Sequence, residues 1–376
     1  MKVLMTGGGT AGHINPALAI ADTIRAHHPD AKFLFVGAPQ GMEARLVPAA
    51  GYEFVSMPVA GFQRKLNLTN IRRNLEAVGH LLRSGGRAAR ILRDFQPDVA
   101  IGTGGYVSGP ILRKAAQMGI PVLVHEANAF PGVTVKMLAH HCECVMVAVE
   151  DAKKRLPDHV RIAVTGNPVR TEVLAYDRDR ARRELGVDDR PLIVSFGGSL
   201  GARTINESML DLLVRSAQDG RYQHIHGYGK FGGFVLDELK ARGVDPDKCP
   251  NLDVREFIKD MPRVMAAADL VICRSGAMTL TEIQALGKAA ILIPSPNVAE
   301  NHQYYNAMAL VDRGAADIIV ESEITPALLT EKADALAGDP QKLAEMSANA
   351  RKMAILDSRE RIYRIVARTL KKHGKL

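Results

Sequence analysis

Two glycine-rich loops, each between a short apolar strand and a helix, determine the predicted organisation of this chain. The first copy of this unit spans residues 2–26, with its loop at 7–12 (GGGTAG) and its predicted helix at Pro16–Ala26. The second spans residues 191–216, with its loop at 197–201 (GGSLG) and its predicted helix at Thr204–Ser216. A strand that leads through a tight glycine loop into a helix is typical of the start of a Rossmann-like domain. The repeat therefore predicts two such domains, and 376 residues are enough for each to bury its own core.

Further short apolar runs, each ending near a Gly or Pro, alternate with helical patterns along the chain. They lie at residues 32–36, 99–101, 121–124, 145–149, 270–273 and 290–293. Strands that alternate with helices predict an α/β fold with parallel sheets covered on both faces. We expect one domain to comprise residues 1–163 and 358–376, since the basic helix at 359–372 returns to it, and the other to comprise 164–357. Residues 166–168 (GNP) are the predicted hinge.

The charges are distributed unevenly between the two predicted domains. Residues 1–163 carry 19 basic and 12 acidic side chains, residues 164–357 carry 23 and 28, and residues 358–376 carry 7 and 1. The first domain is therefore strongly basic and the second is acidic. Such an asymmetry indicates that one face meets an anionic surface, either phospholipid or nucleic acid. Few aromatic residues and no recognisable nucleic-acid module favour phospholipid over nucleic acid.

The first glycine loop fits the dinucleotide pattern GxGxxG. The next strand, however, lacks the carboxylate that binds the ribose in dinucleotide sites. That second strand ends Phe35-Val36-Gly37-Ala38, without an acidic residue, so NAD is not the expected ligand. A backbone-rich loop at a helix N-terminus is still suited to an anion or to close approach by a ligand. His13 follows the loop directly and is a candidate general base for a sugar hydroxyl.

The second loop also fits GxSxG, the nucleophile elbow of α/β-hydrolases, and Glu282 and His302 follow Ser199 in the order of a hydrolase triad. The matching loop in the first domain favours a different interpretation, in which Ser199 donates a hydrogen bond to a phosphate. A third loop at 102–109 (GTGGYVSG) allows close backbone approach. A fourth segment at 274–282 predicts a capped helix start for a diphosphate, with Glu282 two turns along and able to accept from vicinal ribose hydroxyls.

The sequence gives no indication of a bound metal, a membrane-spanning helix or a cofactor. The Asp-x-Asp strings at Asp177 and Asp245 lie in charged, turn-like segments away from the glycine loops, and we interpret them as solvated surface. The four cysteines have no metal-ligand spacing and predict free thiols in a reducing cytosol. The apolar stretches are far shorter than the ~20 residues of a spanning helix, and the first is too short for a signal peptide.

Seven segments in order along the chain resemble the MurG family of bacterial transferases, which add N-acetylglucosamine (GlcNAc) to the lipid-linked precursor lipid I. These segments cover both predicted domains. They are residues 7–16 (GGGTAGHINP), 102–109, 125–128 (HEAN), 166–170 (GNPVR), 196–202, 274–282 and 301–304 (NHQY). The sequence departs from the family at Ala11, where glycine is common, and at Ala127, where glutamine is common. The second departure removes a side chain that could form a hydrogen bond.

The resemblance implies the GT-B fold, with two Rossmann-like domains facing each other across a cleft that holds the active site. It implies an inverting, metal-independent transfer of GlcNAc from UDP-GlcNAc to the muramyl C4 hydroxyl of undecaprenyl-linked lipid I. That reaction makes lipid II for peptidoglycan, and hence serves cell shape and division. The predicted donor-binding residues are Asn128, Arg170, Ser199, Ile258 (uracil), Ala277, Met278, Thr279, Glu282 (ribose) and Gln303. Thr10, Ala11 and Gly12 would lie beside the diphosphate, with His13 as the first candidate base and Glu126 as the second.

The basic segment at residues 61–93 is the predicted membrane-facing element. It contains Arg64, Lys65, Arg72, Arg73, Arg83, Arg87, Arg90 and Arg93, with apolar residues at helical spacing. A basic amphipathic helix can lie on an anionic bilayer, which predicts a peripheral membrane protein. The resemblance implies the cytoplasmic face of the bacterial cell membrane and a cell-wall synthesis complex as the setting. Two alternatives stay open at this point: a GT-B transferase with a different lipid or small-molecule acceptor, and a protein that binds UDP-sugar without turnover.

Overall fold

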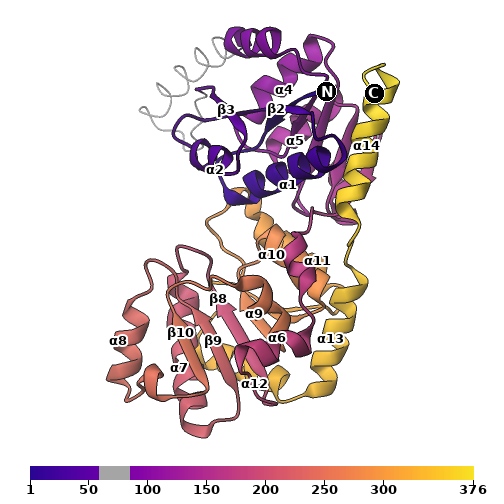
Figure 1. Ribbon diagram of the computed structural model, residues 1–376. Helices are drawn as coiled ribbons and strands as arrows, with labels where there is room; N and C mark the ends of the chain where they lie inside the picture. Colours follow the sequence, from indigo (N-terminus) through magenta and orange to yellow (C-terminus); the bar gives the residue numbers. More distant parts are fainter. Residues whose placement is uncertain (59–84) are drawn as a thin grey trace. The chain divides into compact units, whose positions relative to one another are not determined.

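The computed structural model of the chain describes residues 1–58 and 85–376 and divides them into two compact units (Figure 1). Unit 1 comprises Met1–Pro168 and Ile355–Leu376, and unit 2 comprises Val169–Ala354. These boundaries lie a few residues from those that the sequence predicted. Each unit has its own parallel sheet, so the predicted α/β class with two Rossmann-like domains is confirmed.

The sheet of unit 1 has seven parallel strands in the order β3-β2-β1-β4-β5-β6-β7. The strands are β1 (Lys2–Thr6), β2 (Lys32–Gly37), β3 (Glu53–Ser56), β4 (Val99–Gly102), β5 (Val122–Glu126), β6 (Cys144–Val147) and β7 (Ile162–Val164). The chain runs outward from β1 to β3 and then returns to β4 on the other side of β1. Ligands of open α/β sheets bind at such a reversal, beyond the carboxyl ends of the two strands. Both glycine loops of the first domain follow these ends.

Helices cover both faces of this sheet because alternate strand residues point to opposite sides. Val3 and Met5 belong to a buried cluster with α1 (Ala11–His27), whereas Leu4 belongs to a second cluster with α4 (Ser108–Gln117) and the helix at residues 85–95. The remaining helices of this segment are α2 (Glu43–Ala49) and α5 (Val133–Leu138), and short 3₁₀ turns follow at Ala139–His141 and Glu150–Arg155.

The first helix begins earlier than the sequence predicted. The expected start was Pro16, but α1 begins at Ala11, because the Thr10 carbonyl already accepts from the amides of His13 (3.1 Å) and Ile14 (3.2 Å). Pro16 therefore lies inside the helix. The loop is correspondingly shorter, and His13 belongs to the first turn of α1.

The C-terminal helix α14 (Ser358–Lys372) belongs to unit 1, as predicted. Its residues Ile362, Val366 and Leu370 are buried in the same cluster as α1. The ring of Tyr363 also stacks on His27 of α1, with 3.7 Å between ring centroids. The end of the chain is therefore part of the first Rossmann-like domain.

The sheet of unit 2 has six parallel strands in the order β10-β9-β8-β11-β12-β13, with the corresponding reversal between β8 and β11. The strands are β8 (Leu192–Phe196), β9 (Gln223–Gly227), β10 (Leu252–Arg255), β11 (Leu270–Cys273), β12 (Ala289–Leu292) and β13 (Asp317–Ile318). The helices are α6 (Arg178–Leu185), α7 (Arg203–Asp219), α8 (Phe234–Ala241), α9 (Met261–Ala267), α10 (Ala277–Leu286), α11 (His302–Val311), α12 (Pro326–Ala337) and α13 (Pro340–Lys352). No helix in the described ranges is long and apolar enough to cross a membrane.

Strand β9 carries two buried histidines that are held in the neutral form. Hydrogen bonds join His226 Nδ1 to Ser195 Oγ (2.7 Å) and His224 Nε2 to Ser216 Oγ (2.8 Å). Burial lowers the pKa of His226 to about 4 and that of His224 to about 3. Removing a histidine from water disfavours its charged form, so the folded protein resists protonation at these two sites.

We expect the protein to lose stability as the pH falls from about 6.5 towards 4, because the unfolded chain takes up protons at these histidines and the folded chain does not. The contribution is full above pH ~6.5, and each pH unit below it costs up to about 1.4 kcal/mol for each histidine. Urea unfolding at about pH 7.5 and about pH 5 measures the loss. His226→Gln should weaken the pH dependence, whereas the exposed control His141→Gln should leave it unchanged. An equal pH dependence in His226→Gln and wild type would contradict this account.

Candidate functional site

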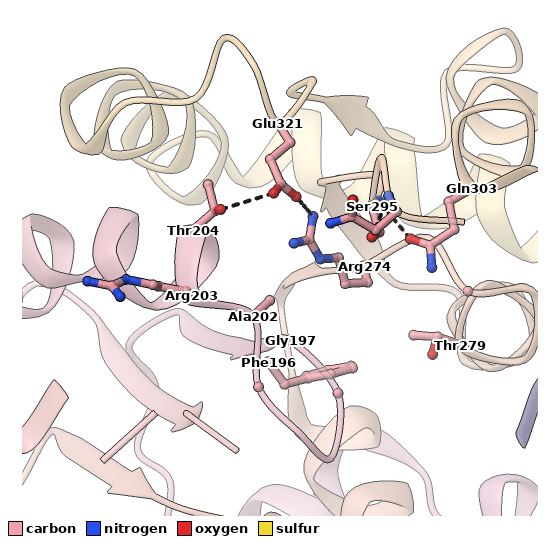
Figure 2. A pocket seen from close by; sticks show the side chains of 14 residues that line it. Phe196, Gly197, Ala202, Arg203, Thr204, Arg274, Thr279, Ser295, Gln303 and Glu321 are labelled. Atoms are coloured by element: carbon pink, nitrogen blue, oxygen red, sulfur yellow. Dashed lines mark hydrogen bonds and ion pairs between the residues drawn. The ribbon is translucent and has the colours of Figure 1, made fainter. Parts of the chain in front are cut away.

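The loops that follow β8, β11 and β12 enclose a cavity of about 560 Å³ in unit 2 (Figure 2). Among the residues that line it are Gly197, Gly198, Gly276, Thr279, Asn297 and Gln303. The cavity therefore lies beyond the carboxyl ends of β8 and β11, where the strand order of unit 2 reverses. This is the part of a doubly wound sheet at which nucleotides bind.

The glycine loop after β8 can adopt its conformation only with glycine at two positions. Gly198 and Gly201 have φ angles of +94° and +84°. A Cβ atom on Gly201 would lie 2.2 Å from the carbonyl oxygen of Tyr228, so no other residue fits there. The loop thus brings bare backbone to the cavity, which is the property that the sequence predicted for it.

Helix α10 begins at the cavity with its N-terminal amides unpaired. Gly276 is its N-cap residue, and its first turn contains no acidic side chain to occupy those amides. The positive end of a helix dipole and several N–H groups together favour an anion at this position. Thr279 lines the cavity, whereas Ala277 and Met278 form the first turn beside it.

Gln303 and Arg274 present further donors to the same cavity. The Oε1 atom of Gln303 accepts from the amide of Ser295 (2.9 Å), so its NH₂ group points away from that bond. The Nη1 atom of Arg274 donates to the carbonyls of Ile293 (3.1 Å) and Pro294 (3.3 Å). The sequence predicted Gln303 as a site residue but gave no role to Arg274, although it lies within one of the matched motifs.

Arg170 and Glu282 form an ion pair that the sequence did not predict, although it named both as donor-binding residues. Arg170 Nε and Nη2 lie 2.9 and 2.8 Å from Glu282 Oε1. Burial raises the pKa of Glu282, and the charge of Arg170 opposes that rise. Both bonds fall on Oε1, so Oε2 has no bonding partner among the described residues. A nearly buried carboxylate with one oxygen available is suited to hydroxyl donors.

Ile258 and Ser199 lie on loops that follow β10 and β8. Ile258 is buried, and its side chain packs where a Cβ atom on Gly227 would lie. No hydrogen bond to its peptide N–H or C=O occurs within the described ranges, so both groups are available to a planar ligand. Ser199 is exposed on the glycine loop and is not among the residues that line the cavity.

The hydrolase alternative is not supported by the structure. Glu282 is paired with Arg170, and His302 Nδ1 donates to the carbonyl of Ala299 (2.7 Å). Ser199 also lies in the loop rather than at a direct strand-to-helix turn, since α7 starts at Arg203. A nucleophile needs its base within hydrogen-bond reach, and these three side chains form no such chain.

The two glycine loops of unit 1 pack directly against each other. The amide of Gly8 donates to the carbonyl of Gly104 (3.3 Å), and Thr103 Oγ1 donates to the carbonyl of His13 (2.6 Å). A Cβ atom on Gly105 would lie 2.5 Å from the carbonyl oxygen of Gly8. Glycine at 105 is thus required for the two loops to come into contact. This contact brings residues 7–13 next to residues 103–105.

The position of His13 follows from this contact. A Cβ atom on Gly104, where φ is +111°, would lie 2.7 Å from the imidazole ring, so the ring lies directly over the bare backbone of Gly104. Thr10, Ala11 and Gly12 beside it are exposed. His13 is therefore a half-buried imidazole at the carboxyl ends of β1 and β4, next to a solvent-facing loop.

Glu43 supports the first glycine loop and was not identified from the sequence. It is 1% exposed, and its two oxygens accept from the amides of Gly9 and Ala38, each at 2.9 Å. Cβ atoms on Gly8, Gly37 and Gly41 would all collide with it. A single glutamate on a short helix gives no sequence signal, because its role comes from contacts with the loop at 7–12, which is distant along the chain.

Glu126, the second candidate base, shapes the loop after β5. It is buried, and its carboxylate accepts from the amide and Nδ2 of Asn128 (2.9 and 3.0 Å) and from the amide of Gly132 (2.9 Å). Burial raises the pKa of Glu126, and the bonds from Asn128 and Gly132 oppose the rise. The structure therefore brings Glu126 and Asn128 together, with both side chains engaged in one loop.

The predicted hinge is partly bound to unit 1. His125 Nε2 donates to the carbonyl of Gly166 (3.1 Å), and Asn167 Nδ2 donates to the carbonyl of Ala127 (3.1 Å). Gly166 has a φ of +77°, and a Cβ atom there would lie 2.8 Å from Ile355. These contacts hold Gly166 and Asn167 against other residues of unit 1.

The first Asp-x-Asp string has a structural role at its first residue. Asp177 is the N-cap of α6 and accepts from the amide of Arg180 (2.9 Å). In the described ranges, no three His, Cys, Asp or Glu side chains are grouped as metal ligands would be.

Comparison with known proteins gives two family matches in the order of the units. Residues 3–147 match the glycosyltransferase family 28 N-terminal domain, and residues 192–362 match the family 28 C-terminal domain. The crystal structure of Acinetobacter baumannii MurG has a TM-score of 0.79 and 30% identity, covering 98% of this chain and 99% of that one. The calicheamicin glycosyltransferase CalG4 (TM-score 0.69, 18% identity, 98% of both chains) shares the fold.

Curated relatives match over almost their whole length. A protein of Acetivibrio thermocellus is 44% identical, over 99% of each chain, and one of Bacillus cereus is 38% identical, over 99% of this chain and 100% of its own. Both are named UDP-N-acetylglucosamine–N-acetylmuramyl-(pentapeptide) pyrophosphoryl-undecaprenol N-acetylglucosamine transferases. With two matched domains and relatives of this identity, the chain belongs to the MurG family of glycosyltransferases.

Proposed function

We propose that the protein transfers GlcNAc from UDP-GlcNAc to the C4 hydroxyl of the muramyl sugar of lipid I, giving lipid II. The observation that carries the proposal is the cavity of unit 2, which is lined by a glycine loop and the N-terminus of α10, the helix that also carries the buried carboxylate of Glu282. A nucleoside diphosphate needs these three elements: donors for the phosphates, room for close approach and an acceptor for ribose hydroxyls. The names of the relatives supply the sugar and the acceptor.

On the donor side, each part of UDP-GlcNAc has a matching group in unit 2. The free peptide groups of Ile258 suit the uracil edge, and Glu282 Oε2 suits a ribose hydroxyl. The amides of α10, with Thr279 and Arg274, suit the diphosphate, and the NH₂ of Gln303 suits a sugar hydroxyl. These donors would stabilise the charge that develops on the leaving UDP.

On the acceptor side, His13 is the proposed base. Its imidazole would take the proton of the C4 hydroxyl while that oxygen bonds to the anomeric carbon and the bond to UDP breaks, with inversion at that carbon. The proposal includes no metal, because helix amides and Arg274 offer the electrostatic stabilisation that a cation would otherwise give.

The test is transfer of labelled GlcNAc from UDP-GlcNAc to a short-chain analogue of lipid I in the presence of EDTA. We expect transfer by the wild-type protein, with one UDP released for each sugar moved. Binding of UDP-GlcNAc without transfer would indicate a different acceptor or a protein that only binds the nucleotide. Transfer that stops in EDTA and returns with Mg²⁺ would overturn the metal-free part.

We also propose that unit 1 meets the cytoplasmic face of the membrane, where a lipid-linked acceptor is found. Most of the predicted basic segment, residues 61–84 of 61–93, lies outside the described residues. The described part has Arg87, Arg90 and Arg93 exposed on the helix at 85–95. Val133 and Met137 are 51% and 54% exposed on α5, with Lys136 between them. Apolar side chains flanked by cations favour anionic bilayers. Participation in a cell-wall synthesis complex stays a prediction.

Met137→Glu should weaken sedimentation of the protein with phosphatidylglycerol vesicles, because it replaces an exposed apolar contact with a charge of the same sign as the lipid. High salt should weaken binding of the wild type as well. Leu174→Glu is the matched control, since Leu174 is 44% exposed but lies on unit 2. Equal loss in both variants would argue against α5 as the contact.

A further inference from the structure

The guanidinium of Arg274 is held at one end only. Its Nη1 atom donates to the carbonyls of Ile293 and Pro294 and forms an ion pair with Glu321. No bond to its Nε or Nη2 atom is formed within the described ranges. The side chain lines the cavity and is 17% exposed. Three N–H groups, one on Nε and two on Nη2, therefore have no partner in the described residues, on a side chain that lines the space we assign to the diphosphate.

Glu321 is itself fixed between two partners, as Figure 2 shows. Its Oε1 atom accepts from Thr204 Oγ1 at the start of α7 (3.0 Å), and its Oε2 atom faces Arg274. The carboxylate is 19% exposed and also lines the cavity. Glu321 thus orients Arg274 and adds a negative charge next to a site for an anion. No sequence motif identified it.

These two effects of Glu321 act on ligand binding in opposite directions. Orientation favours the anion, because an arginine that is already ordered loses less side-chain entropy on binding. Charge opposes the anion, and it opposes UDP more than UDP-sugar, because only the terminal phosphate of UDP can ionise a second time. In a partly buried site, charges several ångströms apart interact strongly enough to change affinity severalfold.

We propose that Glu321 is a positioning and selectivity residue that acts through Arg274. It holds the guanidinium towards the diphosphate, and it lowers the affinity for the product UDP relative to the substrate UDP-GlcNAc. The inference rests on the proposed function of this cavity and deepens it. Glu321 makes no contact with the reacting atoms in this account.

Two substitutions separate the effects, with calorimetric binding of UDP and of UDP-GlcNAc as the measurement. Glu321→Gln keeps the reach of the side chain and both contacts, because its amide oxygen can face Arg274 and its NH₂ can donate to Thr204. We expect it to bind UDP about fivefold more tightly, with a smaller gain for UDP-GlcNAc. Glu321→Asp keeps the charge, but its shorter side chain cannot contact Arg274 and Thr204 at the same time. We expect this variant to bind both ligands about threefold more weakly.

Glu323→Gln is the matched control, because it removes the same charge from an exposed residue of the same segment. It should leave both affinities unchanged, and thermal unfolding should show all three variants folded. The proposal would be overturned if Glu321→Gln and Glu321→Asp changed the affinities by the same factor in the same direction. It would also be overturned if Glu321→Gln left the ratio of the UDP and UDP-GlcNAc affinities unchanged. Neither result would affect the proposed function, which depends on transfer by wild type. If wild type bound neither nucleotide, the proposed function would fail together with this proposal.

Discussion

Replacing Glu282 with alanine is expected to lower kcat/KM for UDP-GlcNAc by roughly 10²–10³-fold, since it removes a buried carboxylate from the ribose. Hydrogen bonds to a charged group contribute about 1.5–3 kcal/mol each, and two vicinal hydroxyls share this acceptor. Each 1.4 kcal/mol corresponds to about a factor of ten. The fold should persist, because Arg170 is 44% exposed and can be solvated when its partner is removed.

Donor analogues make this prediction specific to the ribose. With 2′-deoxyribose in UDP-GlcNAc, wild type should lose much of its affinity, whereas Glu282→Ala should bind both nucleotides equally weakly. Glu282→Gln should be intermediate, because an amide oxygen still accepts but carries no charge. If the deoxy analogue weakened the binding of wild type and of Glu282→Ala to the same extent, Glu282 would not contact the ribose.

Acid should weaken donor binding through the same residue. Burial raises the pKa of Glu282, so its carboxylate takes up a proton at a higher pH than an exposed glutamate does. The charged form, which accepts hydrogen bonds more strongly, is therefore present above the raised pKa and is lost as the pH falls through it.

Replacing His13 with alanine is expected to lower kcat by about 10²–10⁴-fold while the affinity for UDP-GlcNAc stays within about twofold, because a positioned general base contributes that much to proton transfer. The groups that the proposal assigns to UDP-GlcNAc lie in unit 2, although the sequence also predicted Asn128 of unit 1. His13, in contrast, lies over Gly104 in unit 1. Single-turnover transfer to the lipid I analogue measures the chemical step, and calorimetry measures donor affinity.

The controls for His13 are a histidine and an acid of the same unit. His141→Ala removes an exposed imidazole and should leave kcat unchanged. Glu126→Gln replaces one carboxylate oxygen by a donor and should disturb the loop that Asn128 and Gly132 complete. If His13→Ala kept most of its activity and a folded Glu126→Gln lost it, Glu126 would be the base instead.

The fold class was predictable because it depends on local patterns. Apolar runs of strand length and glycines at strand ends can be recognised in the sequence alone. Strands β1 and β8 occur where the sequence predicts strands. The start of α1 was not predictable, because Pro16 suggested a helix start although the Thr10 carbonyl already closes the first turn. Proline disfavours helix interiors on average, but hydrogen bonds of neighbouring residues decide the individual case.

The candidate site was predictable only where a motif carries it. Residues 274–282 and the glycine loops were identified because phosphate binding needs small residues and helix starts at fixed spacing. The pairing of Arg170 with Glu282, and that of Arg274 with Glu321, joins residues far apart in the chain. Nothing in the spacing of such residues says that they meet.

The two Rossmann-like units, the position of the glycine loops and the family to which the chain belongs were all predictable from the sequence, because each depends on residue types within short segments. The side chains that support the loops could be identified only in the folded chain. Glu43 and Glu321 became identifiable once strand order brought separate loops to the same edge of a sheet. A carboxylate has the same sequence signature whether it is solvated or buried, and its partners decide which of the two it is.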